Sequence, residues 1–332
     1  MTVTIATAGA RPLAGSGQNA WLRFAVRRIW RLLISVWVLV TAAFLMIHLI
    51  PGDPVRAALG VQAPQSLVNL RRAALGLNNP LWLQYARYLQ HLFDGNMGTS
   101  ITSNLPVSEV ISQHLPATVE LSVYAFAVAM LISVPLGAVL AVLTRGGRRR
   151  RAELAFTSAS VVLASIPGFL LAVGLVYVFS VHLRWTPVAG QSGLVSYILP
   201  VLSLALGPAF VLARILRVEM LTVLQADYIR TARAKRLPGW LVAVRHALPN
   251  ALTATITLSG LLLSGLVAGT VLVENVFAWP GLGSTIVQSI LAKDYPVVQG
   301  VVLVYGIGVL LVNLAVDILL ALLDPRSTIR ES

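Results

Sequence analysis

The sequence predicts an all-α integral membrane protein with about six transmembrane helices, and three observations support this. Hydrophobic residues make up 57% of the 332 residues and charged residues only 11%, whereas about a quarter of a soluble protein is charged. The apolar residues lie in uncharged runs close to the roughly 20 residues that a bilayer core requires. The basic residues form short clusters between these runs. One soluble core could not bury so much apolar surface, but lipid-facing helices can expose it.

Six uncharged runs are the candidate spans: 32–50, 121–144, 154–183, 185–213, 247–273 and 295–316, the last continuing past Asp317 to Leu323. The competing interpretation of the first run is a cleaved signal peptide. The run is too long for that, and it ends in Pro51-Gly52-Asp53-Pro54 rather than at a small-residue cleavage site. We therefore expect a disordered cytoplasmic tail at 1–20 and a single transmembrane domain at 21–332.

The distribution of positive charge predicts the orientation. With the amino terminus inside, 19 of the 25 Lys and Arg residues fall in inner segments, as the positive-inside rule requires. Both termini are therefore expected in the cytoplasm, with the chain in the cell membrane. The net charge of +13 does not indicate nucleic acid, because the basic residues do not form one face or tail. It is typical of topology signals and contacts with membrane lipid.

Several classes of chemistry are excluded by the residues present. The chain has no cysteine, which rules out disulfides, thiolate metal sites and cysteine nucleophiles, and its five histidines are scattered. Neither Lys235 nor Lys293 follows a glycine, so a Walker A phosphate loop is not possible. We expect no catalytic residue, no metal site and no cofactor bound by this chain.

A carrier that works alone on an ion gradient would bury ionisable groups in mid-membrane. Only Asp317 lies within a predicted span, near its inner end, and we interpret it as a packing or inner-end polar residue rather than a coupling site. Glu274 and Asp294 flank the outer loop between the fifth and sixth spans, where we expect them to be accessible to water.

Two connections are too long to be simple turns. The outer one, 51–116, contains two amphipathic segments, 64–77 and 80–93, each opened by a proline near its first turn. The second has an apolar stripe formed by Leu81, Tyr85, Tyr88, Leu89 and Leu92. We predict an extracytoplasmic helical segment, which is either a small cap on the outer membrane surface or an ordered loop that covers helix ends.

The inner connection, 214–246, contains a basic segment at 225–237 that ends at Pro238-Gly239. Its charges prevent it from spanning the membrane. An ordinary positive-inside loop is the alternative, but such a loop does not need a helix-length segment with defined ends. We favour a docking element here.

The fifth span is rich in small and hydroxylic residues, including the GxxxG pair Gly265 and Gly269. Such residues allow close helix packing in lipid, which favours a subunit interface, with a polar translocation wall as the alternative. Four prolines lie within predicted spans and can kink them: Pro135, Pro167, Pro200 and Pro208. The candidate lining of a translocation path is Ser165, Pro167, Ser259 and Ser264.

The segment from Asp227 to Lys235, followed by 245–252, resembles the cytoplasmic EAA loop of ATP-binding-cassette (ABC) importer permeases, in particular the first permease of the dipeptide, oligopeptide and nickel branch. Further similar motifs occur in order along nearly the whole chain: Pro51-Gly52-Asp53-Pro54-Val55, Leu75-Gly76-Leu77, Gly98-Thr99-Ser100, Leu115-Pro116-Ala117-Thr118, Ser165-Ile166-Pro167, Glu274-Asn275-Val276-Phe277, Trp279-Pro280-Gly281-Leu282-Gly283, Asp294-Tyr295-Pro296-Val297 and Leu323-Asp324-Pro325-Arg326.

The resemblance implies a MetI-like bundle within a heteromeric importer. An external binding protein would deliver di- or oligopeptides, a second permease would complete the path as a heterodimer, and two ATPase domains, separate or fused, would bind ATP and Mg. The alternatives are a nickel or haem importer of the same family or, from another class, a secondary carrier. The implied ATPase-coupling residues are Asp227, Tyr228, Arg230, Thr231, Ala232, Arg233, Ala234, Lys235 and Arg236.

Arg236 departs from the family pattern, which usually has glycine at this position. Glycine reaches a positive φ readily, whereas arginine does so at a cost. We therefore expect the turn to be built differently, for example through Gly239, or the ATPase partner to accommodate a longer side chain.

Overall fold

The computed structural model describes residues 17–49, 54–60, 62–74 and 77–323, and every structural statement below concerns these residues. This part of the chain is almost wholly helical. Five helices are long and apolar enough to cross a membrane, and a bent pair can supply a sixth crossing. The predicted all-α membrane fold with about six spans is confirmed.

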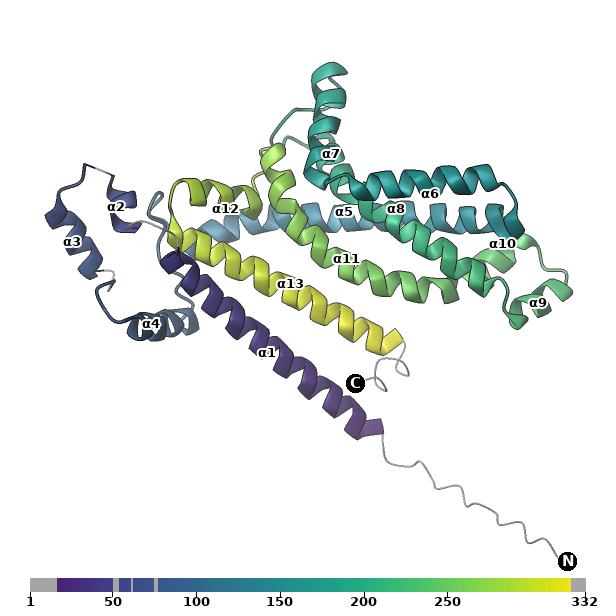
Figure 1. The fold of residues 1–332 in the computed structure, drawn as a ribbon, viewed down its shortest axis with the longest axis horizontal. Coiled ribbons are helices and arrows are strands. Elements are labelled where there is room, and N and C mark those ends of the chain that lie inside the picture. The colour runs from purple at the N-terminus through teal and green to yellow at the C-terminus, as the bar shows by residue number, and fades with distance from the viewer. Residues whose placement is uncertain (1–16, 50–53, 61, 75–76, 324–332) are drawn as a thin grey trace, which may run out of the picture.

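The long helices form one bundle (Figure 1). They are α1 (Gly17–Leu49), α5 (Val107–Thr144), α6 (Arg150–Ser165) with α7 (Gly168–Leu175), α8 (Ile198–Val223), α11 (Leu248–Val276) and α13 (Tyr295–Leu323). The most extensive packing joins α5 to α8, and α1 lies along α13. Four short helical turns complete the connections: η1 (Arg145–Gly147), η2 (Val176–His182), η3 (Leu194–Tyr197) and η4 (Val242–Ala247).

Short helices gather at the two ends of the bundle (Figure 1). At one end are α9 (Asp227–Ala234) and α10 (Gly239–Leu241), and at the other are α2 (Pro54–Leu59), α3 (Gln65–Ala74), α4 (Leu81–Phe93) and α12 (Leu282–Leu291). We call these the α9 end and the α12 end.

The third predicted span is broken in two. Helices α6 and α7 meet at a bend of 99°, and Figure 1 shows α7 turning away from the axis that α6 shares with α5. The break falls at Ile166–Pro167 because proline has no amide hydrogen and disfavours a helical conformation in the residue before it; Ile166 is extended, with ψ 120°. By contrast, Pro135 and Pro208 lie inside α5 and α8, which continue through them.

Two long helices extend into the predicted connections. Helix α5 begins at Val107 and includes Pro116, so residues 107–116 of the segment predicted at 51–116 form its first turns. At 38 residues this helix is about 57 Å long, well beyond the roughly 30 Å hydrocarbon core. Helix α8 continues to Val223, so residues 214–223 of the connection predicted at 214–246 are helical and continue α8. Charged residues therefore do not mark the ends of these helices, because a helix can carry charges that are paired or that project beyond the membrane.

Arg217 shows why α8 can carry charge. Its side chain is buried, and its guanidinium pairs with Glu153 of α6 at 2.7 Å and donates a hydrogen bond to the Thr144 hydroxyl of α5 at 3.0 Å. A buried cation is tolerated only when it is paired and hydrogen-bonded. This contact ties α5, α6 and α8 together near the α9 end.

The two predicted amphipathic helices are confirmed as α3 and α4. Tyr88, Leu89 and Leu92 of α4 pack against a cluster formed by Val40, Ala43 and Leu303, and the hydroxyl groups of Tyr85 and Thr41 lie 2.8 Å apart. Leu81, predicted in the same stripe, is 56% exposed. The stripe therefore attaches α4 to α1 and α13, starting from Tyr85.

The predicted tail at 1–20 lies mostly outside the described residues. Its described part, from Gly17, is already helical and belongs to α1. Residues 50–53, 75–76 and 324–332, which carry parts of three of the motifs above, also lie outside them.

Candidate functional site

Helix α9 and the turn that leads from it to α10, residues 227–239, lie at the α9 end of the bundle. We call this segment the elbow. Ile229 is fully buried and Ala232 nearly so, and both belong to an apolar cluster with Leu216 and Met220 of α8 and Val242 of η4. Residues three and four apart share one face of a helix, so this face anchors α9 to the bundle. The opposite face is left exposed.

The predicted coupling residues divide between these two faces. The exposed members are Asp227, Tyr228, Arg230, Thr231, Ala234, Lys235 and Arg236. The Arg230 side chain is 75% exposed, and its guanidinium pairs with Asp227 at 3.3 Å. Arg233 lies on the anchored side, where its guanidinium donates to the Leu224 carbonyl at 3.3 Å. Burial first, and the nearby positive charge of Arg145 second, lower the pKa of Arg233.

Arg236 closes the elbow in the left-handed conformation, with φ +54°. Its amide donates to the Arg233 carbonyl at 2.8 Å, and Pro238 then continues in an extended conformation. The turn is not built through Gly239, which was one of the two alternatives, because arginine itself takes the conformation that glycine adopts freely. For an L-residue with a β-carbon this costs about 1–2 kcal/mol.

A groove of about 460 Å³ lies at the break between α6 and α7. Ile166 and Pro167 line it at the break, Ser203 and Gly207 line it from α8, and Gly265, with Gly269 and several leucines, lines it from α11. The lining is mostly apolar. Helix α8 thus contributes to both features: its last residues lead into the elbow, and Ser203 and Gly207, nearer its start, line the groove.

The structure does not bring the four predicted path residues together. Pro167 lines the groove, and Ser165 is exposed at the end of α6, where its hydroxyl donates to the Val161 carbonyl. Ser259 is buried and donates to the Ile256 carbonyl, and Ser264 donates to the Asn313 side chain of α13 at 2.7 Å.

Helix α11 therefore has two different faces. A β-carbon at Gly260 would collide with Val316 of α13, so this glycine allows the two helices to pack closely. Gly265 has open space beside its α-carbon and faces the groove. The small residues noted in the sequence thus serve close packing within the chain at Gly260 and form the groove wall at Gly265.

At the α12 end, Glu274 of α11 is fully buried. Its carboxylate accepts hydrogen bonds from the Thr118 hydroxyl at 2.7 Å and from the amides of Gly283 and Ser284 at 2.6 and 3.1 Å. These amides belong to the first turn of α12, where backbone N–H groups lack helical partners. Glu274 was predicted to be accessible to water, and that was wrong: the carboxylate fixes α12 against α11 and α5.

Asp294 makes a second connection of this kind just before α13, and it is 1% exposed. Its carboxylate accepts from the hydroxyls of Ser100 and Thr102 at 2.5 and 2.7 Å and from the amides of Ile101 and Thr102 at 3.1 and 3.2 Å. Burial alone would raise the pKa of Asp294, but these hydrogen bonds together outweigh it and lower the pKa. The expectation of a water-accessible residue was wrong here too.

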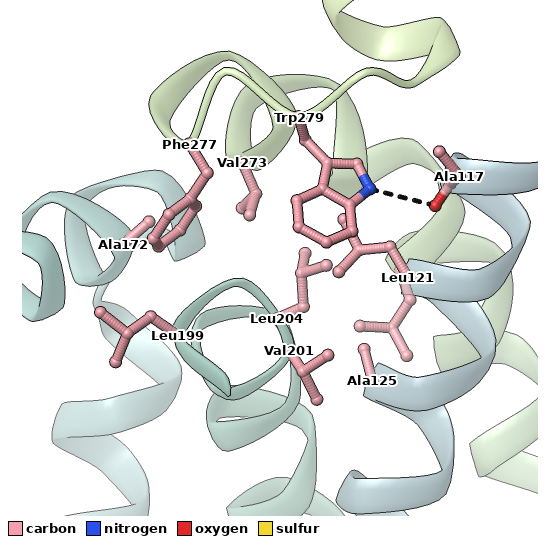
Figure 2. Close-up of a cluster of buried hydrophobic side chains, with 11 residues drawn as sticks. Ala117, Leu121, Ala125, Ala172, Leu199, Val201, Leu204, Val273, Phe277 and Trp279 are labelled. Carbon is pink, nitrogen blue, oxygen red and sulfur yellow. Dashed lines mark hydrogen bonds between the residues drawn. The ribbon is translucent and has the colours of Figure 1, made fainter. Parts of the chain in front are cut away.

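An apolar cluster of the bundle includes Trp279, from the loop between α11 and α12 (Figure 2). The indole is fully buried, and its N–H donates to the Ala117 carbonyl at 3.3 Å. Leu121 of α5 and Leu204 of α8 lie beside it, and Phe277, which follows α11, belongs to the same cluster. The loop between α11 and α12 is thereby packed into the bundle.

In the described residues, no three His, Asp or Glu side chains gather where they could hold a metal ion. Asp317 of α13 pairs with Arg28 of α1 at 2.5 Å. It joins two helices, as a packing residue does.

Comparison with known proteins identifies the family. A model described as "Binding-protein-dependent transport system inner membrane component" matches residues 133–329, and the model of the corresponding N-terminal region matches residues 21–122. The chain belongs to this family of ABC importer permeases. It is thus a multi-pass inner-membrane transport subunit, and the resemblance drawn from its motifs is confirmed.

The permease has similar relatives over nearly its whole length. It is 39% identical to the probable D,D-dipeptide transport system permease protein DdpB of Escherichia coli, with 90% of this chain and 96% of the relative covered. It is 38% identical to the glutathione transport system permease protein GsiC of Salmonella paratyphi A, with 92% and 98% covered.

Among solved structures, the permease is similar to a chain of the MetNI methionine ABC transporter in an inward-facing conformation. The TM-score is 0.55 at 19% identity, and the match covers 65% of this permease and 96% of that chain. A likeness at this identity concerns the fold, and it confirms the MetI-like bundle.

Proposed function

We propose that this permease serves an importer of di- or oligopeptides, with the α9 end and both chain termini in the cytoplasm. The relatives named for D,D-dipeptide and glutathione transport support a peptide substrate over nickel or haem. The excess of Lys and Arg in the segments on the α9 side supports the orientation.

The observation that carries the coupling role is the division of α9 into an anchored face and an exposed face. Ile229 and Ala232 hold the helix on the bundle, while Tyr228, Arg230 and Thr231 face outward. A helix fixed in this way moves as a rigid body when a partner pushes it. In this proposal the partner is an ATPase that binds ATP and Mg, and the permease supplies no catalytic residue or cofactor.

The position of α8 supports a mechanical connection between the elbow and the proposed path. Helix α8 leads from α9 to the groove, and Arg217 joins α8 to α5 and α6 on the way. Movement of α9 would therefore shift α8 together with the α6–α7 break. We place the translocation path at the groove, with Pro167 and Ser165 beside it. A second permease would cover the groove's open side, and an external binding protein would dock at the α12 end.

The absence of cysteine from the chain makes the coupling contact directly testable. Thr231→Cys, labelled with a maleimide-linked photocrosslinker in the assembled transporter, should crosslink to the ATPase. Thr253→Cys, an exposed threonine on α11, is the matched control and should not. An ATPase that crosslinks equally to both positions, or to neither, contradicts the coupling role of α9.

Charge reversal tests the same contact by function. Arg230→Glu should abolish ATP-dependent peptide uptake in proteoliposomes that contain the complete transporter, because it reverses the exposed charge on α9 without touching the anchored face. Arg151→Glu makes the same charge change at an exposed position at the start of α6 and should leave uptake near wild type. Uptake by this chain alone without ATP would instead indicate a secondary carrier.

A further inference from the structure

A second hollow, of about 490 Å³, lies on the anchored side of α9. One wall is the α5–α6 turn with Arg145, Gly146 and Arg148, and the facing wall includes Arg233. The remaining lining is apolar and comes from both sides of the elbow: Val142, Leu224, Leu237, Val242 and Ala243, with Gly239. The hollow thus combines a cationic rim with an apolar interior.

The three arginines have no acidic partner within the described part of the chain. The ion pairs near this end join Glu153 to Arg217 and Asp227 to Arg230, and neither includes Arg145, Arg148 or Arg233. Burial and the charge of Arg145 both lower the pKa of Arg233, as expected for cations held near one another without a counter-charge. An anion in the hollow would relieve this repulsion.

The position of the hollow separates it from the face assigned to the ATPase. Arg233 lies one turn from Ile229, which is fully buried against the bundle, so the two share the face of α9 that points toward the spans. The Arg230 side chain, by contrast, is 75% exposed. The hollow also adjoins Val142, within the α5 span. In the proposed orientation it therefore opens at the level of the cytoplasmic leaflet.

We propose that this hollow binds an anionic phospholipid of the cytoplasmic leaflet, with the lipid phosphate between Arg145, Arg148 and Arg233. Guanidinium groups bind phosphate oxygens through paired N–H donors, and basic pockets between helix ends on the cytoplasmic side are suited to lipid headgroups. The apolar walls at Val142 and Val242 would receive the first part of an acyl chain. Such a lipid would support the elbow from the membrane side while the ATPase contacts it from below.

This inference rests on the proposed orientation and coupling role. It is tested on the complete transporter, purified in detergent and titrated with phosphatidylglycerol, with bound lipid counted by native mass spectrometry. The double variant Arg145→Gln/Arg148→Gln should weaken phosphatidylglycerol binding by about tenfold or more. Arg145→Lys/Arg148→Lys, which keeps the charge, should retain most of the binding.

The matched control is Arg150→Gln/Arg151→Gln, which removes the same charge from exposed positions outside the hollow. It should bind phosphatidylglycerol like the wild type, and neutral phosphatidylcholine should not distinguish the variants. Equal binding in both double variants, or equal loss, overturns the proposal. So does loss of the ATPase with lipid retained, which would mean that an ATPase group occupies the hollow. If the wild-type complex does not form at all, it is the proposed function that fails.

Discussion

Charged side chains have different surroundings at the two ends of the permease. At the α12 end, the carboxylates of Glu274 and Asp294 are buried and accept hydrogen bonds from hydroxyl and amide groups of other segments. At the α9 end, Arg230, Lys235 and Arg236 are exposed, and within the described residues the one ion pair among them joins Arg230 to Asp227. The two buried carboxylates of the α12 end are thus satisfied internally, whereas these three cations of the α9 end remain available to partners.

The difference follows from the donors within reach. A buried carboxylate is stabilised when several N–H and O–H groups point at it, and the first turn of α12 supplies two such amides to Glu274. The exposed cations of α9 stay solvated until a partner provides acceptors. The α12 end is therefore expected to be rigid, and the α9 end to be completed by assembly.

The largest effect on stability is expected for Glu274→Gln, which tests whether the hydrogen bonds of this carboxylate stabilise the α12 end. Glutamine fills the same space, but its one oxygen can replace only the carboxylate oxygen that accepts from the two backbone amides. Its NH2 group then faces the Thr118 hydroxyl, which loses the acceptor that the second carboxylate oxygen provides. Leaving this buried donor unpaired should lower the free energy of unfolding by about 3 kcal/mol. Thermal unfolding followed by tryptophan fluorescence would show this, since Trp279 is buried beside the site. The exposed Glu109→Gln is the control, and similar stability of the two variants would mean that Glu274 does not hold α12.

A smaller effect is expected for Asp294→Asn, and it should depend on pH. The folded-state pKa of Asp294 lies below its ordinary value of 3.8. A depressed pKa stabilises the fold above the unfolded-state pKa, and the contribution is lost as the pH falls through the folded-state pKa. The wild type should therefore be more stable than Asp294→Asn at pH 5–7, by about 1–2 kcal/mol, and this advantage should shrink below about pH 4. A stability difference that stays constant into acid would contradict the assignment.

The smallest effect concerns the α9 end. Arg236→Gly should raise the free energy of unfolding by up to about 1 kcal/mol, because glycine adopts a positive φ without the steric cost of a β-carbon. Lys235→Gly, at the preceding residue with φ −74°, should instead lower it by a few tenths to about 1 kcal/mol. Opposite signs for the two neighbours in thermal unfolding would locate the strain at Arg236. Equal signs would show that the conformation of the turn is not strained.

The sequence was most informative where the signal is local. Uncharged runs located the spans, proline and amphipathic spacing located α3 and α4, and a basic segment that ends at Pro238-Gly239 located α9. It was least informative where a charge has a distant partner. The charge of Arg214 predicts the end of a span, yet α8 continues to Val223, and Arg217 on that extension contacts Glu153 and Thr144.

The candidate site divides in the same way. Residue type and spacing identified the coupling segment, but not which side of α9 each residue would face. Arg230 and Arg233 look equivalent in the sequence, yet one is exposed and the other bonds the Leu224 carbonyl on the anchored side. Ser264 was a candidate for the path because it is small and polar, and only the packing of α11 on α13 shows that Asn313 engages its hydroxyl.

The sequence by itself determined that this is a membrane protein, how many times the chain can cross the bilayer, and which segment forms a basic helix. These properties follow from hydropathy, charge and helix signals, which depend on neighbouring residues. Only the tertiary structure showed that the carboxylates of Glu274 and Asp294 are buried and hydrogen-bonded. Thr118 lies 156 positions from Glu274, and Ser100 lies 194 from Asp294. No local pattern records such pairs, since a hydrogen bond depends on where folding places its donor and acceptor and not on how far apart they stand in the chain.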